Sequence, residues 1–148
     1  MSAKSFPYVL TFVMLLSSCG DGDSNGDEKN PGGLKGTTWR LVKIDAIDGG
    51  SIVLDQIDTI VLSFDDERRI SGKSPGMCGN TYFGLYTITE ENTFRTDSLL
   101  STQAYCPASQ YHYFYDQLRK AEKYRRTGAR LELLCDNQSQ RLVFRSYR

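Results

Sequence analysis

The stretch that decides the fold runs from residue 78 to residue 86 and reads Cys78-Gly79-Asn80-Thr81-Tyr82-Phe83-Gly84-Leu85-Tyr86. Tyr82, Gly84 and Tyr86 alternate with other residues, as the residues on one face of a β-strand do. Gly79 and Asn80 tolerate positive φ, so they are suited to the tight turn that leads into this strand. Gly84 leaves a gap on one face of the sheet, where we expect an aromatic ring or a helix to pack closely. We therefore interpret the motif as a signature of the fold without a chemical role. The alternative interpretation is a ligand cleft lined by Tyr82 and Tyr86.

Strands are also predicted on both sides of this stretch. Apolar and polar residues alternate in 38–47, 59–65, a short run containing Ile70, 80–89, 93–96, 98–102, 131–135 and 141–146. Turn-forming residues separate these runs, for example in the charged cluster 65–69 and at 49–50, 127–128 and 136–137. Period-two alternation between polar turns predicts antiparallel strands with one buried face.

One segment has the spacing of a helix instead. Between Ser109 and Tyr124 the apolar positions form one stripe, made of Tyr111, Phe114, Tyr115, Leu118, Ala121 and Tyr124. Ser109 is the predicted N-cap, with Pro107 just outside the helix. The C-terminal end of a helix favours cations, and four basic residues lie at or just beyond this end of the segment: Lys120, Lys123, Arg125 and Arg126. A binding patch for an acidic partner is the alternative interpretation of this basic cluster.

The order of these elements, together with several short motifs, resembles the META domain family, whose bacterial members include HslJ-like heat-shock lipoproteins. The motif 78–86 resembles the core motif of the family, which has Cys and Asn followed by a spaced Tyr, Gly and Tyr. Supporting matches are Trp39-x-Leu41, Leu62-x-Phe64, Ser71-Gly72, Ser101-Thr102 with Cys106, Leu131-x-Leu133 and Leu142-x-Phe144. The resemblance implies an α+β fold, in which a mostly antiparallel, partly closed barrel packs against one helix.

The N-terminus predicts export and lipidation. The apolar run 6–16 contains 11 residues, too few to span a bilayer, since a spanning helix needs about 20. It fits the apolar region of a secretory signal. Leu16-Ser17-Ser18-Cys19 resembles the lipobox of bacterial lipoproteins, which implies cleavage before Cys19 and lipidation of Cys19 with acyl chains such as palmitate. An ordinary signal peptide cut near Ser17 or Ser18 is the alternative.

Composition divides the chain into three parts. Residues 1–18 are the predicted lipoprotein signal peptide, 19–33 the lipidated Cys19 and a flexible acidic tether, and 34–148 a META-like domain. Residues 20–33 hold five Gly, three Asp, one Glu and no aliphatic or aromatic residue, so they cannot bury enough apolar surface to fold. The domain has 16 basic and 14 acidic residues, a net charge of +2 that gives no argument for nucleic acid.

The cysteines predict one disulfide. Lipidation of Cys19 leaves Cys78, Cys106 and Cys135, in a compartment where pairing is expected. Three thiols permit three pairings. The resemblance favours Cys78–Cys106, because both lie in segments that match the family. Cys135 is then a free thiol in the strand 131–135, and facing the core it would act as a small hydrophobic residue.

The sequence offers no recognisable catalytic or metal-binding pattern. His112 is the only histidine, and a dyad with Cys78 would lack a third partner. No spacing of His, Cys or carboxylates is typical of a metal site, and no Gly-rich phosphate loop follows a strand. We therefore predict a monomeric, non-enzymatic protein without a cofactor.

Function is predicted only in outline. The resemblance implies a role in the envelope and in stress response, so the leading hypothesis is a lipid-anchored interaction or chaperone-like module at the outer membrane, on its periplasmic or outer face. Its partner would be an envelope protein. A barrel that binds a small apolar ligand or lipid is one alternative. An inhibitor of an envelope hydrolase is another, and a protruding loop with a rigid aromatic anchor would favour it.

Overall fold

The computed structural model describes residues 33–46, 48–54, 59–74, 79–89, 92–105 and 109–148. Within them lie nine strands and one helix: β1 (Thr37–Ala46), β2 (Ser51–Val53), β3 (Val61–Phe64), β4 (Arg69–Lys73), β5 (Thr81–Ile88), β6 (Phe94–Ser101), α1 (Tyr111–Arg119), β7 (Ala121–Thr127), β8 (Arg130–Cys135) and β9 (Gln140–Ser146). Within these ranges, α1 is neither long nor apolar enough to cross a membrane.

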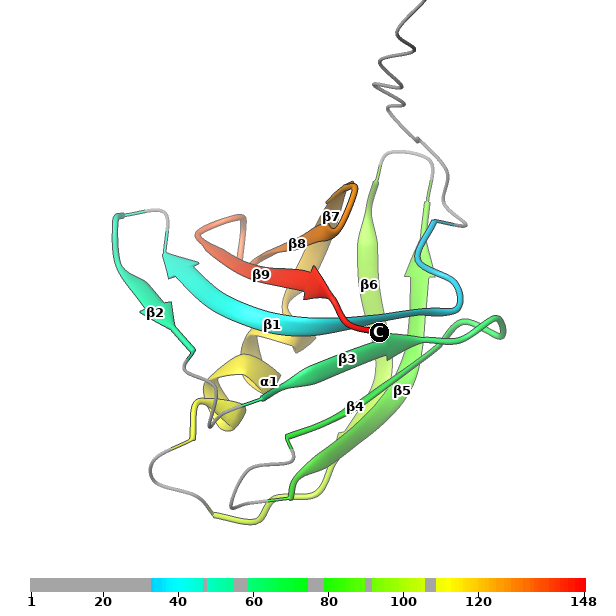
Figure 1. Ribbon diagram of the computed structural model, residues 1–148, viewed down its shortest axis with the longest axis horizontal. Coiled ribbons are helices and arrows are strands. Elements are labelled where there is room, and N and C mark those ends of the chain that lie inside the picture. Colours follow the sequence, from blue (N-terminus) through cyan, green and yellow to red (C-terminus); the bar gives the residue numbers. More distant parts are fainter. Residues whose placement is uncertain (1–32, 47, 55–58, 75–78, 90–91, 106–108) are drawn as a thin grey trace, which may run out of the picture.

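The strands form one antiparallel sheet that curls into a half-barrel (Figure 1). The strand order is β6-β5-β4-β3-β1-β9-β8-β7, with β2 added to β1. The helix α1 packs inside the curl, against β6, β8 and β9. The α+β fold expected from the resemblance, a partly closed barrel with one helix packed against it, is therefore confirmed.

The two end strands, β6 and β7, meet at one end and are bridged by the helix at the other. Thr93 and Lys123 form an isolated bridge, and the Tyr124 N–H donates to the carbonyl oxygen of Asn92 at 2.9 Å. Further along β6, the Tyr115 hydroxyl of α1 donates to the carbonyl oxygen of Leu99 at 2.9 Å. The helix thus binds a backbone carbonyl of the edge strand β6, which would otherwise be free to pair with another strand.

The core fills the space between the curled sheet and the helix. Inward positions of every strand except β2 contribute to it, as does the apolar stripe of α1. Its largest fully buried side chains are Trp39, Tyr82, Phe94, Tyr111, Phe114 and Phe144.

The predicted helix is too long at both ends. It begins at Tyr111, with Gln110 as the N-cap residue, and ends at Arg119. Ser109 is not the N-cap, although its hydroxyl accepts a hydrogen bond from the Tyr111 N–H at 3.1 Å. The residues beyond Lys120 form β7, whose pairing with β8 shifts register between Ala121 and Lys123. This bulge turns both Ala121 and Tyr124 inward, a spacing of three residues that imitates a helix.

A second bulge explains another difference. The predicted runs 93–96 and 98–102 are one strand, β6, whose pairing with β5 shifts register between Phe83 and Leu85. Ser98 has a φ of 51° at this irregularity. The extra residue interrupts the period-two alternation, so the sequence pattern reads as two strands. The turns predicted at 49–50, 127–128 and 136–137 are confirmed, with φ values of 104° at Gly49, 55° at Gly128 and 53° at Asp136.

Candidate functional site

Tyr82 of the motif lies in the core and passes over a glycine of the neighbouring strand. It is 1% exposed, and its hydroxyl donates to the carbonyl oxygen of Val61 at 2.7 Å. Its cross-strand partner is Gly72, where a Cβ would lie 1.9 Å from the Val61 oxygen and 2.3 Å from the Tyr82 hydroxyl. Only glycine leaves room for this ring. Burial raises the pKa of Tyr82 well above its usual value, so the hydroxyl stays protonated and remains a donor.

The two motif glycines have different roles. Gly79 has a φ of 56°, which confirms the positive φ expected before the strand. Gly84 does leave a close approach, but the neighbour differs from the predicted ring or helix: a Cβ there would lie 2.9 Å from the Cα of Leu99. The backbone of β6 therefore fills the gap, at the bulge that shifts its register.

Tyr86 also belongs to the core. It is 4% exposed, and its ring centroid lies 5.0 Å from that of Phe64 and 6.0 Å from that of Phe94. Tyr82 packs likewise against aromatic rings of α1, including Phe114 at 5.6 Å. Both tyrosines fill the barrel, so the ligand cleft that the alternative interpretation gave them is not formed by these residues.

Asn80 fastens the start of β5 to a distant segment. It is fully buried, its side-chain amide donates to the carbonyl oxygen of Ala104 at 2.9 Å, and its Oδ1 accepts from the Ala104 N–H at 2.8 Å. The Thr102 hydroxyl donates to the same Oδ1 at 3.2 Å. Cys78 and Cys106, the predicted disulfide partners, each lie two residues from this contact in the sequence but outside the described residues, as does Cys19.

Cys135 lies in the core, as expected for the free cysteine. It is fully buried on β8, and burial raises the pKa of its thiol to about 12. Such a thiol is protonated at neutral pH and is therefore a poor nucleophile. It acts as a small hydrophobic residue.

A metal site requires several ligand side chains close together. Among the described residues, no group of three or more His, Cys, Asp or Glu side chains has this arrangement. His112 lies on α1 with its ring centroid 5.8 Å from that of Tyr111. Because Cys78 is outside the described residues, the dyad considered above remains without structural support.

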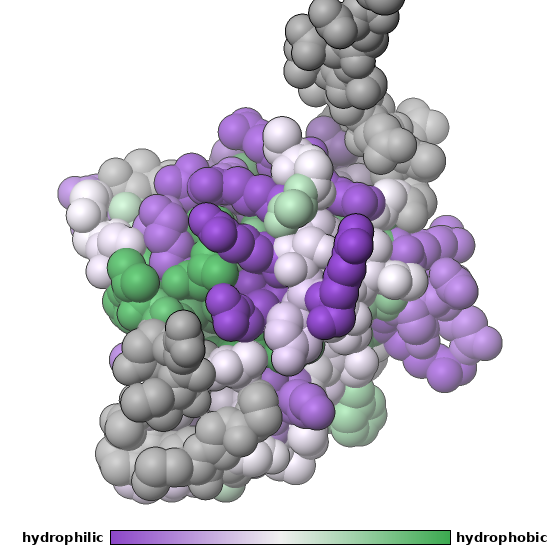
Figure 2. All heavy atoms as spheres, in the orientation of Figure 1, coloured by the Kyte–Doolittle hydropathy of each residue, from purple (hydrophilic) through white to green (hydrophobic). Residues whose placement is uncertain are grey.

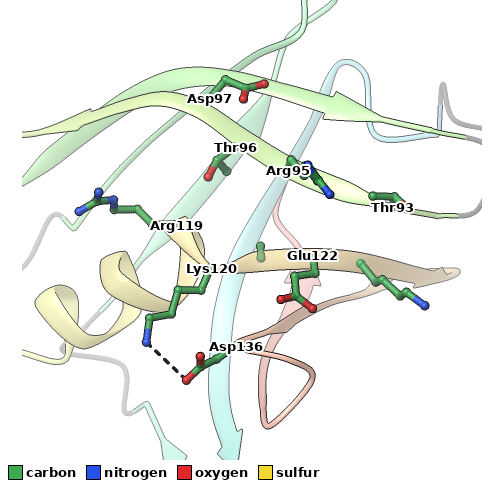
Figure 3. A pocket seen from close by; sticks show the side chains of 10 residues that line it. Thr93, Arg95, Thr96, Asp97, Arg119, Lys120, Glu122 and Asp136 are labelled. Carbon is green, nitrogen blue, oxygen red and sulfur yellow. Dashed lines mark hydrogen bonds and ion pairs between the residues drawn. The ribbon is translucent and has the colours of Figure 1, made fainter.

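A groove, here called the seam groove, runs between β6 and β7 beside the end of α1 (Figure 3). Its volume is about 590 Å³, and charged side chains of both signs line it, namely Arg95, Asp97, Arg119, Lys120, Glu122, Lys123 and Asp136. Lys120 pairs with Asp136 at 3.4 Å, and Glu122 accepts from the Asn137 N–H at 3.2 Å. One ion pair therefore joins two of these groups, and the mixture of both charges along the groove does not single out one class of ligand.

Only one residue of the predicted basic cluster lies at the helix end. Lys120 follows the last residue of α1, whereas Lys123, Arg125 and Arg126 lie on β7. Arg126 stacks over the ring of Trp39, with its guanidinium carbon 5.5 Å from the ring centroid. Its guanidinium also donates to the carbonyl oxygen of Gly33, where the chain enters the domain.

The outer face of β5 and β6 carries an apolar patch, made of Phe83, Leu85 and Leu100. These side chains are 60%, 47% and 58% exposed. Phe83 and Leu100 are cross-strand partners, and Leu85 lies two residues along β5 from Phe83 on the same face. Sequence reasoning missed this patch, although a signal exists: residues 82–86 are uninterruptedly non-polar, whereas a half-buried strand alternates.

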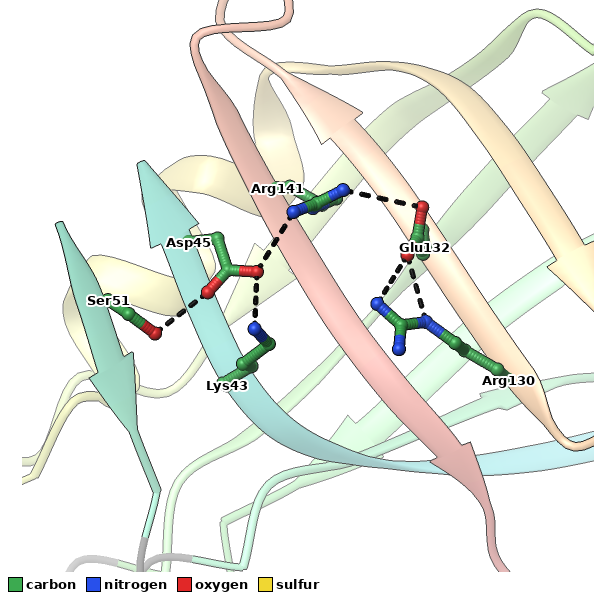
Figure 4. Close-up of polar contacts among 6 residues, drawn as sticks. All are labelled: Lys43, Asp45, Ser51, Arg130, Glu132 and Arg141. Atoms are coloured by element: carbon green, nitrogen blue, oxygen red, sulfur yellow. Dashed lines mark hydrogen bonds and ion pairs between the residues drawn. The ribbon is translucent and has the colours of Figure 1, made fainter. Parts of the chain in front are cut away.

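A chain of ion pairs crosses the outer face of β1, β9 and β8 (Figure 4). Lys43 and Arg141 both bind the Asp45 carboxylate, at 2.8 and 3.2 Å, and Arg130 binds Glu132 at 2.6 Å. Burial alone would raise the pKa of Asp45, but the hydrogen bonds from Lys43, Ser51 and Arg141 outweigh it and lower that pKa. Asp45 and Glu132 are thus both paired with basic side chains of the same sheet.

The comparisons with known proteins agree with this architecture. The sequence profile of the META domain family matches residues 32–147, which is most of the chain. A solved structure of a protein from Burkholderia xenovorans is similar with a TM-score of 0.63 and 18% identity, over 98% of this chain and 99% of that one. A DUF4847 family protein from Bacteroides vulgatus is similar with a TM-score of 0.56 and 16% identity, over 76% of this chain and 93% of that one. At these identities the two structures indicate a shared fold. A search among curated proteins found no match.

Proposed function

Since the chain belongs to the META domain family, we propose that it is a lipid-anchored, non-enzymatic interaction module of the bacterial cell envelope. The anchor is the predicted lipid on Cys19, at the outer membrane. The domain binds an envelope protein, in a stress-related or chaperone-like role.

The observation that carries the proposal is the apolar patch. Its three large side chains lie side by side on the outside of the sheet, where they do nothing for the core. Contiguous apolar surface of this kind, rimmed by polar residues, is typical of protein-binding sites. Thr81, Thr87 and Asp97 supply such a rim.

Crosslinking in intact cells tests this proposal. We expect the wild-type chain to yield a specific protein product, and the Leu85→Ser/Leu100→Ser variant to lose it while keeping its circular dichroism spectrum. Val53→Ser/Tyr147→Ser is the matched control, because Val53 and Tyr147 are 74% and 46% exposed but lie away from the patch. Recovery of lipid alone, without any protein, would sink the proposal.

The anchor has a separate test. The Cys19→Ser variant should lose its lipid and appear in the soluble fraction after export. If it stays in the membrane fraction, the lipidation and the assignment of the other cysteines both need revision.

An inhibitor of an envelope hydrolase is the second candidate, and Tyr105 favours it. This side chain is 84% exposed, and it directly follows Ala104, which Asn80 holds through two hydrogen bonds. A protruding aromatic residue beside a fixed backbone is the kind of anchor that inhibitors insert into a cleft. Loss of the crosslinked product in Tyr105→Ser, with Leu85→Ser/Leu100→Ser unaffected, would favour this candidate over the first.

A further inference from the structure

Basic residues are concentrated on one side of the sheet, although the domain as a whole is nearly neutral. The outward positions of β8, β9, β1, β3 and β4 hold two acidic residues, Asp45 and Glu132, and seven basic ones: Arg40, Lys43, Arg69, Lys73, Arg130, Arg141 and Arg145. Figure 2 shows this side of the molecule, with long hydrophilic side chains standing out over its middle. A net charge of +2 hides this separation of charge.

Four of these residues form a single line across the strands, here called the basic row: Arg130, Arg145, Arg40 and Lys73. Arg130 is the cross-strand partner of Arg145, and Arg145 is the partner of Arg40. Val61 lies between Arg40 and Lys73 and is the partner of both. Because neighbouring strands lie about 4.8 Å apart, the row spans about 19 Å over five strands.

The acidic residues of this face do not neutralise the row. Asp45 and Glu132 are buried, with side chains 9% and 10% exposed, and they are occupied by Lys43, Arg141 and Arg130. Within the part of the chain that the structure describes, Arg40, Lys73 and Arg145 make no ion pair. Three cations of the row are therefore available to an external anion.

The row does not help the sheet to fold. Like charges directly opposite one another on adjacent strands are destabilising. Arg130, Arg145 and Arg40 are placed in this way on three adjacent strands. The arrangement thus acts against stability, and an anionic partner would relieve it.

One end of the row lies close to the point where the tether joins the domain. Arg126 of β7 contacts the carbonyl oxygen of Gly33, and its neighbour Thr127 is the cross-strand partner of Arg130. Residues 19–32 separate the predicted lipid from Gly33. If residues 19–32 are the flexible tether that their composition predicts, their end-to-end distance is about 20 Å, which would keep the row near the membrane surface.

We propose that the basic row binds the anionic phosphate headgroups of the membrane that holds the lipid anchor, so that the domain lies with this face against the bilayer and its apolar patch free for a protein partner. The proposal rests on the proposed lipid anchor, which would place the domain at the membrane. Binding of phosphate headgroups by the basic row does not itself require the acyl chains.

Vesicle cosedimentation of the full chain carrying Cys19→Ser tests the row without the acyl anchor. The probes are vesicles of phosphatidylglycerol mixed with phosphatidylcholine, and vesicles of phosphatidylcholine alone, which report any binding by the apolar run 6–16. We expect a preference for the anionic vesicles that weakens at high salt. Each basic residue near an anionic surface contributes about fivefold in affinity, so Arg40→Gln/Arg145→Gln should reduce anionic binding about 25-fold.

The matched control is Arg95→Gln/Arg119→Gln, which removes the same charge from the seam groove and should keep the preference for anionic vesicles. Melting temperature supplies a second readout, because relief of like-charge repulsion should leave Arg40→Gln/Arg145→Gln as stable as the parent chain or more stable. Equal loss in both double variants, or no preference for anionic vesicles in the parent chain, would overturn the proposal. If the row variant instead loses a crosslinked protein and keeps vesicle binding, the row is a protein site.

The same assay separates this proposal from the proposed function. Leu85→Ser/Leu100→Ser should bind anionic vesicles like the parent chain. If it does not, the apolar patch faces the bilayer, so the proposed protein-binding role and the orientation that leaves the patch free both fail. The binding of headgroups by the row is judged separately, from Arg40→Gln/Arg145→Gln.

Discussion

The two faces of β5 differ completely in what they do. Tyr82 and Tyr86 point inward, where they are 1% and 4% exposed and pack against other aromatic rings. Phe83 and Leu85 alternate with them but point outward, at 60% and 47% exposure. The inner face carries the two tyrosines of the motif that resembles the core motif of the family. Those residues build the fold. The outer face of β5 carries apolar side chains where a half-buried strand normally has polar ones, so it is the better guide to function.

The largest effect is expected at the inner face. Tyr82→Ala removes a buried ring, its packing against α1 and its hydrogen bond to Val61, so it should lower the free energy of unfolding by about 3–5 kcal/mol. Urea denaturation measures this change. A loss below about 1 kcal/mol would mean that the motif tyrosine does not hold the barrel together.

The next effect concerns the start of the same strand. If Cys78 and Cys106 are paired, Cys106→Ser should lower the stability by about 3–4 kcal/mol in the chain-entropy account of disulfides. Peptide mapping without reduction identifies the bond. A crosslink between Cys78 and Cys135 would contradict both the pairing and the burial of Cys135.

A smaller effect is expected where Tyr82 crosses β4. Gly72→Ala places a methyl group against the Val61 carbonyl and the Tyr82 ring, so it should cost about 1–3 kcal/mol by overpacking. The control is Gly50→Ala, whose Cβ would meet nothing closer than 3.6 Å. Equal stabilities of the two variants would show that the ring does not lie over Gly72.

The smallest effect on stability is expected at the outer face. Phe83→Ser should change the free energy of unfolding by no more than about 0.5 kcal/mol, as surface substitutions usually do. Thermal unfolding beside Tyr82→Ala measures the contrast between adjacent residues. A large loss in Phe83→Ser would make the apolar patch part of the fold.

Much of the fold could be predicted from local patterns, and the exceptions have physical causes. Alternation identified most of the strands, and the glycine at residue 79 identified a turn. The bulges at Glu122 and Ser98 interrupted the periodicity, because one extra residue changes which side chains face inward. Nothing local indicated β2, since all three of its residues are exposed.

The candidate surfaces were harder to predict than the fold. The basic row depends on the register of five strands, which brings together residues as distant in sequence as Arg40 and Arg145. The net charge of the domain counts the basic residues of the row together with acidic residues that lie elsewhere, so the composition does not reveal the row. The apolar patch has a local signal in residues 82–86. These residues also belong to the motif that resembles the family, and its tyrosines, not Phe83 and Leu85, are the predicted site residues.

Site-specific photocrosslinking in cells tests the central claim most directly. A benzophenone side chain placed by Phe83→p-benzoylphenylalanine should give a defined protein adduct, because position 83 lies in the centre of the proposed partner surface. The same substitution at Val53, which is 74% exposed, should give none. Equal labelling at both positions, or no adduct at position 83 in correctly folded protein, would contradict the account.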